Sequence, residues 1–209
     1  VSGADVVILV VKPQDIPTLL ADIGQAIEPD ALIISIAAGI TTSRIESLIG
    51  PRGHVIRAMP NTPASIGMAV TGVSAGSSSG IEHVDQARAL LQTVGAVVVV
   101  PEELQDCVTA VSGSGPAYVF YLAEAMVAAA MDMGLDAGTA RSIVTGTLEG
   151  AACLLASSDA DARELRARVT SPNGTTAAAT AVFDDRGLSD VVGSGMRAAR
   201  DRARELSAT

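Results

Sequence analysis

The sequence predicts an α/β unit built on a parallel β-sheet, followed by a region made only of helices. Between residues 5 and 100, short runs of branched apolar residues alternate with segments whose apolar residues recur at helical spacing. This alternation is typical of βαβ units, which form parallel sheets. From residue 104 onward the strand-like runs stop, and helical patterns follow one another. We therefore expect two domains, over residues 1–101 and 102–209.

The first domain has five strand-like segments with helices between them. The first two segments are continuous apolar runs, as expected for strands buried on both faces of a sheet. We expect the strands at residues 5–11, 32–36, 54–59, 68–75 and 96–100. Apolar residues at helical spacing place the helices at residues 16–27, 41–49 and 81–94.

The second domain is predicted to consist of helices that pack closely. Aromatic residues make up only 2% of the chain and tryptophan is absent, so small side chains must supply most helix contacts. The glycines of the segment 112–116 favour a close helix crossing, with Pro116 in the first turn of the next helix. We expect helices at residues 102–112, 116–134, 137–157, 161–170, 174–183 and 188–207.

Composition and charge exclude several classes of protein. The formal net charge is −9 over 209 residues, which argues against a nucleic-acid partner. Cys107 and Cys153 have no metal-binding or redox spacing, and the two histidines belong to no ligand-like cluster, so we expect no metal site. The longest apolar run, residues 117–131, contains Glu124 and is too short to span a bilayer. With no signal peptide recognised, we expect a cytoplasmic protein with no membrane partner.

Three successive strand ends predict a ligand crevice. In a parallel sheet, ligands bind at the carboxyl ends of the strands. Residues 11–13 place a cation and a proline at this edge. After Ile36, residues 37–39 carry no bulky side chain, so a flat ring can lie against their backbone. Residues 59–63 form a rigid turn with an amide and a hydroxyl. Together these features indicate a nucleotide crevice.

The segment Thr-Ser-Pro-Asn-Gly-Thr-Thr at residues 170–176 is the second candidate site. Asn173 and Gly174 tolerate positive φ and allow a sharp turn before an alanine-rich helix. Ser171, Thr175 and Thr176 are each suited to cap that helix. A helix start of this kind offers free amides and a positive dipole end to a small carboxylate. The alternative is an ordinary capped turn.

The expected pyrophosphate loop is missing from the sequence. No Gly-x-Gly-x-x-Gly turn follows an opening strand. The glycines at 113–115 lie between helices, and those at 193–195 lie inside a helical pattern. Residues 1–5 look like the approach to a middle strand. We therefore expect the first part of the nucleotide-binding domain to lie outside this sequence.

Five blocks in collinear order resemble the pyrroline-5-carboxylate reductase family over essentially the whole chain. Val-Ser-Gly-Ser-Gly-Pro-Ala-Tyr and Ser-Pro-Asn-Gly-Thr-Thr are the most specific, although the family usually has a second glycine where this chain has Asn173. Asparagine is the next best residue at positive φ, so we expect the turn to be kept. The five blocks are residues 11–13, 37–39, 59–63, 111–118 and 171–176.

The resemblance implies a fold, a reaction and a partner. Members of the family reduce 1-pyrroline-5-carboxylate to L-proline, the last step of proline biosynthesis, usually with NADPH and alternatively with NADH. They combine a Rossmann-type domain with a helical domain that interleaves with a second subunit. The resemblance therefore implies an NADP-dependent oxidoreductase and a homodimer, with a higher oligomer left open.

The resemblance also implies which residues form the site. The residues assigned to the cofactor are Val10, Val11, Lys12, Pro13, Ile36, Ala37, Ala38 and Asn61. The residues assigned to the substrate are Glu102, Ser171, Gly174, Thr175 and Thr176. Glu102 also opens a helix, where a carboxylate is favourable for structural reasons alone, and Ser171 either caps a helix or contacts the substrate.

Thr176 is the candidate catalytic residue. Our hypothesis is that the amides of Gly174, Thr175 and Thr176 hold the substrate carboxylate, while the Thr176 hydroxyl points at the ring nitrogen. A threonine hydroxyl is a weak acid, so it orients the protonated imine or relays a proton from water.

Two other functions are considered. A hydroxyacid dehydrogenase of similar layout needs a lysine in its helical domain, and the chain has no lysine after Lys12. The remaining alternative is a helical dimerisation module that is catalytically inactive because its cofactor domain is truncated.

Overall fold

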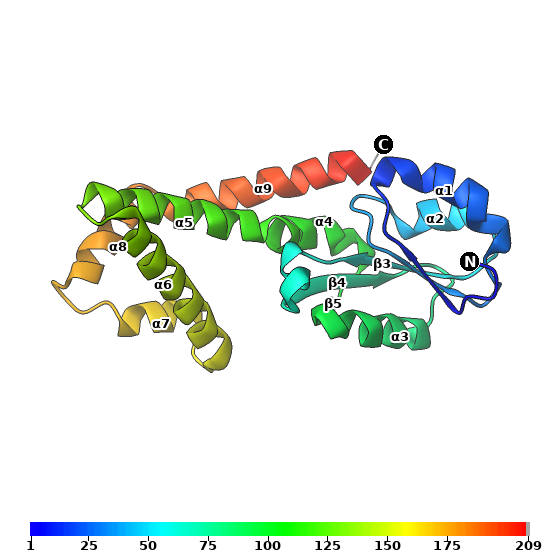
Figure 1. The fold of residues 1–209 in the computed structure, drawn as a ribbon, viewed down its shortest axis with the longest axis horizontal. Helices are drawn as coiled ribbons and strands as arrows, with labels where there is room; N and C mark the ends of the chain where they lie inside the picture. The colour runs from blue at the N-terminus through cyan, green and yellow to red at the C-terminus, as the bar shows by residue number, and fades with distance from the viewer. Residues whose placement is uncertain (208–209) are drawn as a thin grey trace. The chain divides into compact units, whose positions relative to one another are not determined.

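The computed structural model describes residues 1–207, and their contacts define two compact units. The first unit comprises Val1–Pro116 together with the stretch from Met196 onward, and the second is Ala117–Gly195 (Figure 1). The sequence placed a single boundary near residue 101, and that boundary stays a prediction. The compact units differ from it because the segments that follow residue 101 contact β4, and the end of the last helix contacts α4 and the turn after β2.

The first unit is built on a five-stranded sheet with the order β1-β2-β3-β4-β5. The expected strands are all present, and the first is shorter than its apolar run. β1, β2 and β3 are parallel, as the βαβ pattern predicts. The strands are β1 Val6–Leu9, β2 Leu32–Ser35, β3 His54–Met59, β4 Ala69–Ala75 and β5 Gly95–Val99.

β4 runs antiparallel to β3, which corrects the expectation of a fully parallel sheet. The connection over residues 60–68 is too short for a crossover, which takes about a dozen residues or more. The chain therefore turns back on itself, and β4 pairs with β3 in the opposite direction. β5 is again parallel to β4 because a full helix separates the two strands. The fold is the expected Rossmann-type α/β fold with a mostly parallel sheet.

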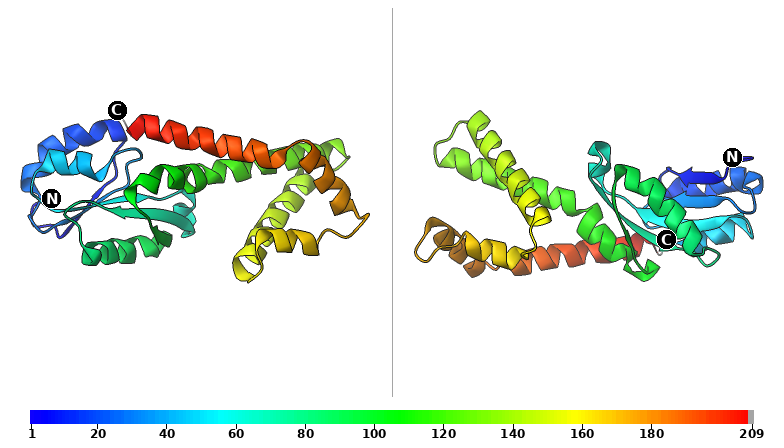
Figure 2. Two further views of the ribbon diagram at one scale, coloured as in Figure 1. Left: turned by 180° about the vertical axis from the view of Figure 1, so that it is seen from behind. Right: turned by 90° about the horizontal axis from the view of Figure 1, so that it is seen from below.

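Helices cover both faces of this sheet, as Figures 1 and 2 show. α1 (Ile16–Ile23) and α2 (Thr42–Ile49) pack on one face, with a core that includes Leu9 and Ile33. α3 (Ile81–Leu91) packs on the other face. Short 3₁₀ turns extend or link these elements: η1 Pro13–Asp15, η2 Gly24–Ala26, η3 Thr62–Ile66, η4 Gln92–Val94 and η5 Glu102–Leu104.

Beyond η5, the described residues form helices only, as the sequence predicts. α4 Gln105–Val108 and the π-helical turn η6 Thr109–Gly113 lead into α5. Asp136 caps α6, and hydrogen bonds from Thr139 and Gly138 lower the pKa of its carboxyl group. The longer helices are α5 Gly115–Asp132, α6 Ala137–Ser157, α7 Ala162–Arg168, α8 Thr175–Asp185 and α9 Leu188–Ser207.

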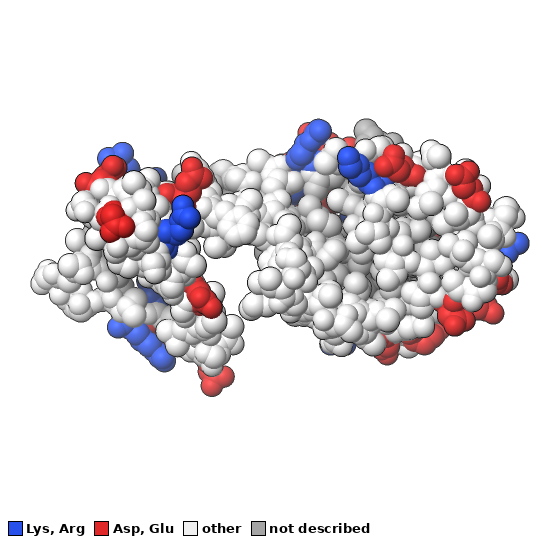
Figure 3. Space-filling view, in the orientation of Figure 1, with Lys and Arg blue, Asp and Glu red and all other residues white. Residues whose placement is uncertain are grey.

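The described surface carries scattered charges. On the face drawn in Figure 3, acidic groups line the outer rim of the first unit, and basic groups stand in small numbers between them. Over residues 1–207, no helix combines the length and the apolar character that crossing a bilayer requires.

Candidate active site

The carboxyl ends of β1 and β2 bring together seven of the predicted cofactor residues. Leu9 and Ser35 are paired at the last positions of these parallel strands, and the amide of Ile36 donates to the carbonyl of Leu9 at 3.2 Å. The two following segments therefore leave the sheet side by side. The residues concerned are Val10, Val11, Lys12 and Pro13 after β1, and Ile36, Ala37 and Ala38 after β2.

A pocket of about 890 Å³ lies beside this edge, which is within the range of cofactor sites. Its walls come from the starts of α1 and α2 and from the end of α9, and they include Pro13, Ala38, Gly39, Arg44 and Ser207. Gly39 adopts a φ of 76°, and the turn that it ends has no side chain larger than a methyl group. The end of α9 covers Gly39, but Ala38 beside it is exposed, so a flat ring can approach the backbone at Ala38. The residues present therefore fit a nicotinamide cofactor.

Asn61 has its side chain engaged within the protein. Its Nδ2 atom donates to the carbonyl oxygen and the hydroxyl of Ser112, at 3.2 and 3.1 Å. Its Oδ1 atom accepts from the amide of Val70 at 2.9 Å, and the Ser112 hydroxyl also bonds the Val70 carbonyl. Asn61 thus ties the π-helical turn η6 to β4. Its predicted contact with the cofactor stays a prediction.

Replacing Asn61 with alanine is expected to lower the free energy of unfolding by about 2 kcal/mol, because partly buried partners lose their hydrogen bonds. Ser65→Ala is the matched control, since its exposed hydroxyl bonds only the Thr62 carbonyl. Urea unfolding measures both variants. Equal midpoints for the two variants would show that Asn61 does not tie η6 to β4.

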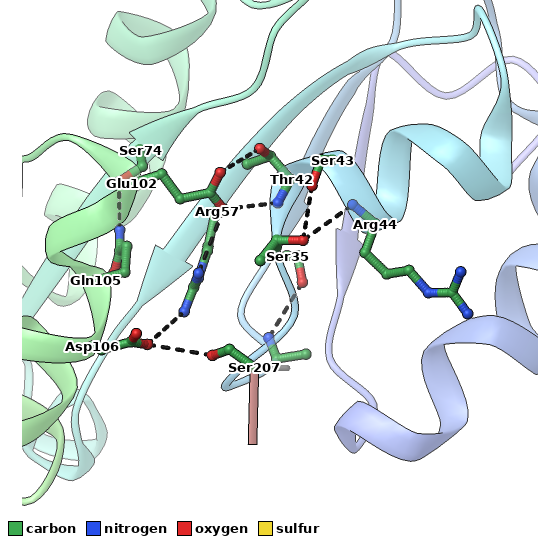
Figure 4. A network of polar contacts seen from close by, with 12 residues as sticks. Ser35, Thr42, Ser43, Arg44, Arg57, Ser74, Glu102, Gln105, Asp106 and Ser207 are labelled. Atoms are coloured by element: carbon green, nitrogen blue, oxygen red, sulfur yellow. Dashed lines mark hydrogen bonds and ion pairs between the residues drawn. The ribbon is translucent and has the colours of Figure 1, made fainter. Parts of the chain in front are cut away.

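Glu102 belongs to a network of polar contacts around a buried arginine (Figure 4). Its Oε1 atom accepts from the amide of Thr42 at 2.8 Å, and its Oε2 atom accepts from the Thr42 hydroxyl at 2.6 Å. Arg57 lies with Nη1 3.5 Å from Glu102 and Nη2 3.7 Å from Asp106. The Arg57 side chain is 5% exposed.

Sequence reasoning missed Arg57, although a signal was present. Arg57 is the one charged residue in the otherwise apolar β3 run Val-Ile-Arg-Ala-Met. A cation in a strand that is buried on both faces needs a partner of opposite charge. The acids of the segment 102–106 supply it.

In the second unit, Ser171–Gly174 forms a type II turn. The amide of Gly174 donates to the carbonyl of Ser171 at 3.0 Å, Pro172 occupies the second position, and Asn173 has a φ of 61° at the third. Asn173 is the one non-glycine residue with positive φ in the described part of the chain. The expectation that asparagine keeps this turn is confirmed.

The helix after the turn starts without a side-chain cap. α8 begins at Thr175, with Gly174 in the N-cap position, so the capping roles considered for Ser171, Thr175 and Thr176 are not seen. The amides of Thr175 and Thr176 lack an intrahelical partner because they lie in the first turn, and Gly174 has no side-chain acceptor to cap them. Ser171 packs over Gly174, where an added Cβ would lie 2.5 Å from the Ser171 hydroxyl.

The predicted site residues thus fall into two groups. The crevice, Asn61 and Glu102 belong to the first unit, and the turn with Ser171, Gly174, Thr175 and Thr176 belongs to the second.

Among the described residues, no group of three or more metal-ligating side chains could hold a metal ion. A mostly parallel sheet with helices on both faces, and a crevice at the carboxyl ends of β1 and β2, defines the Rossmann class of nucleotide-binding folds.

Comparison with known proteins identifies the family. Residues 102–206 match the family model described as pyrroline-5-carboxylate reductase dimerisation, and residues 1–39 match the one described as NADP oxidoreductase, coenzyme F420-dependent. The pyrroline-5-carboxylate reductase of Pseudomonas aeruginosa is 43% identical over 208 residues, covering 99% of this chain and 76% of the relative. The chain belongs to the pyrroline-5-carboxylate reductase family.

Solved structures agree with this assignment. A pyrroline-5-carboxylate reductase from Coxiella burnetii superposes with a TM-score of 0.94 at 37% identity, covering 99% of this chain and 77% of that one. The Plasmodium falciparum pyrroline carboxylate reductase, solved with NADP bound, gives a TM-score of 0.89 at 24% identity and covers 97% and 77% of the two chains. At this lower identity, the likeness concerns the fold.

Proposed function

We propose that this protein reduces 1-pyrroline-5-carboxylate to L-proline, the last step of proline biosynthesis, with a hydride from NADPH. The observation that carries the proposal is the presence, in one chain of this family, of a small-residue crevice and an uncapped helix start. The crevice follows β1 and β2, and the uncapped start is that of α8. Family membership favours this reaction over the inactive dimerisation module.

The turn before α8 is suited to the substrate carboxylate. The amides of Thr175 and Thr176 lie in the first turn of an eleven-residue helix, where the dipole favours negative charge. The Gly174 amide is already bonded to the Ser171 carbonyl. We therefore assign the carboxylate to the amides of Thr175 and Thr176, while Gly174 and Ser171 shape the turn around it.

The Thr176 hydroxyl is assigned to the ring nitrogen. When bound, NADPH supplies the hydride for the imine carbon. The side chain of Thr176 is partly buried, and the next turn is held in place by a hydrogen bond from the Thr180 hydroxyl to the Thr176 carbonyl at 3.0 Å. A hydroxyl at this position orients the protonated imine or relays a proton from water.

The cofactor assignment rests on the crevice and on the family. Val10 to Pro13 and Ile36 to Ala38 are proposed to line the nicotinamide end, with Asn61 contributing at the third strand end. Glu102 is proposed to lie beside the substrate. NADPH is the proposed donor, with NADH as the alternative, and the cytoplasm is the proposed location.

We propose a homodimer with interleaved helical domains. The matched family model concerns dimerisation, and the second unit carries large apolar side chains in contact with solvent. Phe120 is 66% exposed and Tyr121 is 75% exposed. Burying such side chains against a second copy removes them from water, which is the main driving force for stable dimers.

The test is NADPH consumption by the full-length protein in the presence of 1-pyrroline-5-carboxylate. We expect oxidation that depends on substrate and yields proline. A protein that is folded and dimeric but oxidises no NADPH or NADH would overturn the proposal and leave the dimerisation module. Sedimentation of the same sample measures the oligomeric state.

A further inference from the structure

Arg57 lies at the centre of two chains of contacts that end on the two elements flanking the turn Ala37–Gly39, here called the crevice turn. We propose that Arg57 is a positioning residue for the cofactor: through Glu102 and Asp106, it holds the two elements that flank the turn Ala37–Gly39. This inference rests on the proposed function for the identity of the cofactor. The contacts themselves lie within the first compact unit.

The first chain of contacts runs to the start of α2. Arg57 pairs with Glu102, whose two carboxylate oxygens accept from the amide and the hydroxyl of Thr42. Thr42 is the first residue of α2, and only Ile40 and Thr41 separate it from the crevice turn. A carboxylate at a helix N-terminus is electrostatically favourable, and here it accepts from both the amide and the hydroxyl of one residue. The downstream end of the turn is thereby held.

The second chain of contacts runs to the end of α9. Arg57 also faces Asp106, which accepts from the Ser207 hydroxyl at 3.3 Å (Figure 4). A Cβ added to Gly39 would lie 3.4 Å from the Leu206 carbonyl oxygen and 3.5 Å from the Ser207 amide. The last turn of α9 therefore lies directly against the crevice turn, and Asp106 anchors it there.

The guanidinium group is suited to this task in a way that an ammonium group is not. The two acids stand on different terminal nitrogens of Arg57, Nη1 for Glu102 and Nη2 for Asp106. Only a planar fork presents two such nitrogens at once, whereas lysine offers a single point charge. With Arg57 removed, the two acids lose their shared cation and repel each other, which strains the contacts of Glu102 with Thr42 and of Asp106 with Ser207. We expect the crevice turn to move as a result.

The experiment measures NADPH binding directly, by fluorescence titration of the full-length protein. Arg57→Met is expected to raise the Kd for NADPH about ten-fold, because a displaced turn no longer fits the ring. Arg57→Lys, which keeps the charge, is expected to fall between Arg57→Met and the wild type. The matched control is Arg88→Met, the same change on the exposed face of α3, and its Kd is expected to stay unchanged.

A double-mutant cycle tests whether Arg57 acts through Glu102. If it does, Arg57→Met combined with Glu102→Gln weakens NADPH binding about as much as the stronger single variant. Fully additive losses, or an unchanged Kd in Arg57→Met, would overturn the inference. Should Arg57→Met fail to fold, Arg57→Lys decides by the same titration: weaker binding supports the inference, and unchanged binding overturns it.

The result of the Arg57 experiment can be distinguished from the result of the test of the proposed function. Wild-type protein that binds NADPH but does not oxidise it with 1-pyrroline-5-carboxylate contradicts the proposed reaction and leaves the titration valid. If the wild-type protein oxidises NADPH and the Arg57→Met variant binds NADPH with an unchanged Kd, only the role of Arg57 is contradicted. A lower melting temperature with unchanged Kd would mark Arg57 as structural and would also overturn the inference.

Discussion

Replacing Thr176 with alanine is expected to lower the turnover number more than about ten-fold while the protein stays folded. The substitution removes the hydroxyl assigned to the imine nitrogen and keeps the backbone amide assigned to the carboxylate. Substrate binding should therefore suffer less than turnover. Steady-state kinetics with 1-pyrroline-5-carboxylate and NADPH measure kcat and KM separately, and circular dichroism checks the fold.

Two control variants make this result specific. Thr176→Ser keeps a hydroxyl at the same position and should restore most of the activity. Thr175→Ala makes the same change one residue earlier, where the side chain is exposed and only the amide is assigned a role. Unchanged kinetics in Thr176→Ala, or equal losses in Thr175→Ala and Thr176→Ala, would remove the catalytic role from this hydroxyl.

Gly95→Ala is expected to destabilise the protein by about 4 kcal/mol or more, which places it among the most severe single substitutions. Gly95 opens β5 with a φ of 148°, a conformation that is essentially limited to glycine. An added Cβ would overlap the carbonyl oxygen and the amide nitrogen of Ala69 and lie 2.7 Å from its carbonyl carbon. Ala69 is the β4 partner of Gly95, so neither strand can yield without breaking the pair.

Thermal unfolding measures this effect, and the melting temperature is expected to fall by about 10 °C. Gly24→Ala is the matched control in the same unit. Gly24 has a helical φ of −56°, and an added Cβ would meet its nearest neighbours at 3.9 Å, in ordinary contact. Similar melting temperatures for the two variants would mean that the strand pair at Gly95 tolerates a side chain.

Most of the fold was predictable because its signals are local. The β3 bounds agree with the sequence prediction because an apolar run is enclosed by Gly53 on one side and Pro60 on the other. The direction of β4 was not predicted, because apolar patterning does not encode direction. The short connection over residues 60–68 does carry that information.

The sequence predicted those parts of the candidate site that depend on the backbone preferences of single residues. Asn173 and Gly174 predict a turn because both residues tolerate positive φ. The structure has that turn, with Asn173 at positive φ. Which group caps α8 depends on where the helix begins, and a shift of one residue decides between threonine and glycine. The partners of Arg57 lie far along the chain at Glu102 and Asp106, so local patterns could not assign them.

The reversal of the chain between β3 and β4 also has a practical use. Because β4 runs against β1 to β3, the loop that follows it, Gly76–Gly80, emerges at the edge of the sheet opposite the crevice. Ser77 in that loop is exposed. A fluorophore or surface anchor attached there would leave the crevice open to solution, which suits the protein to an immobilised sensor for its nicotinamide cofactor.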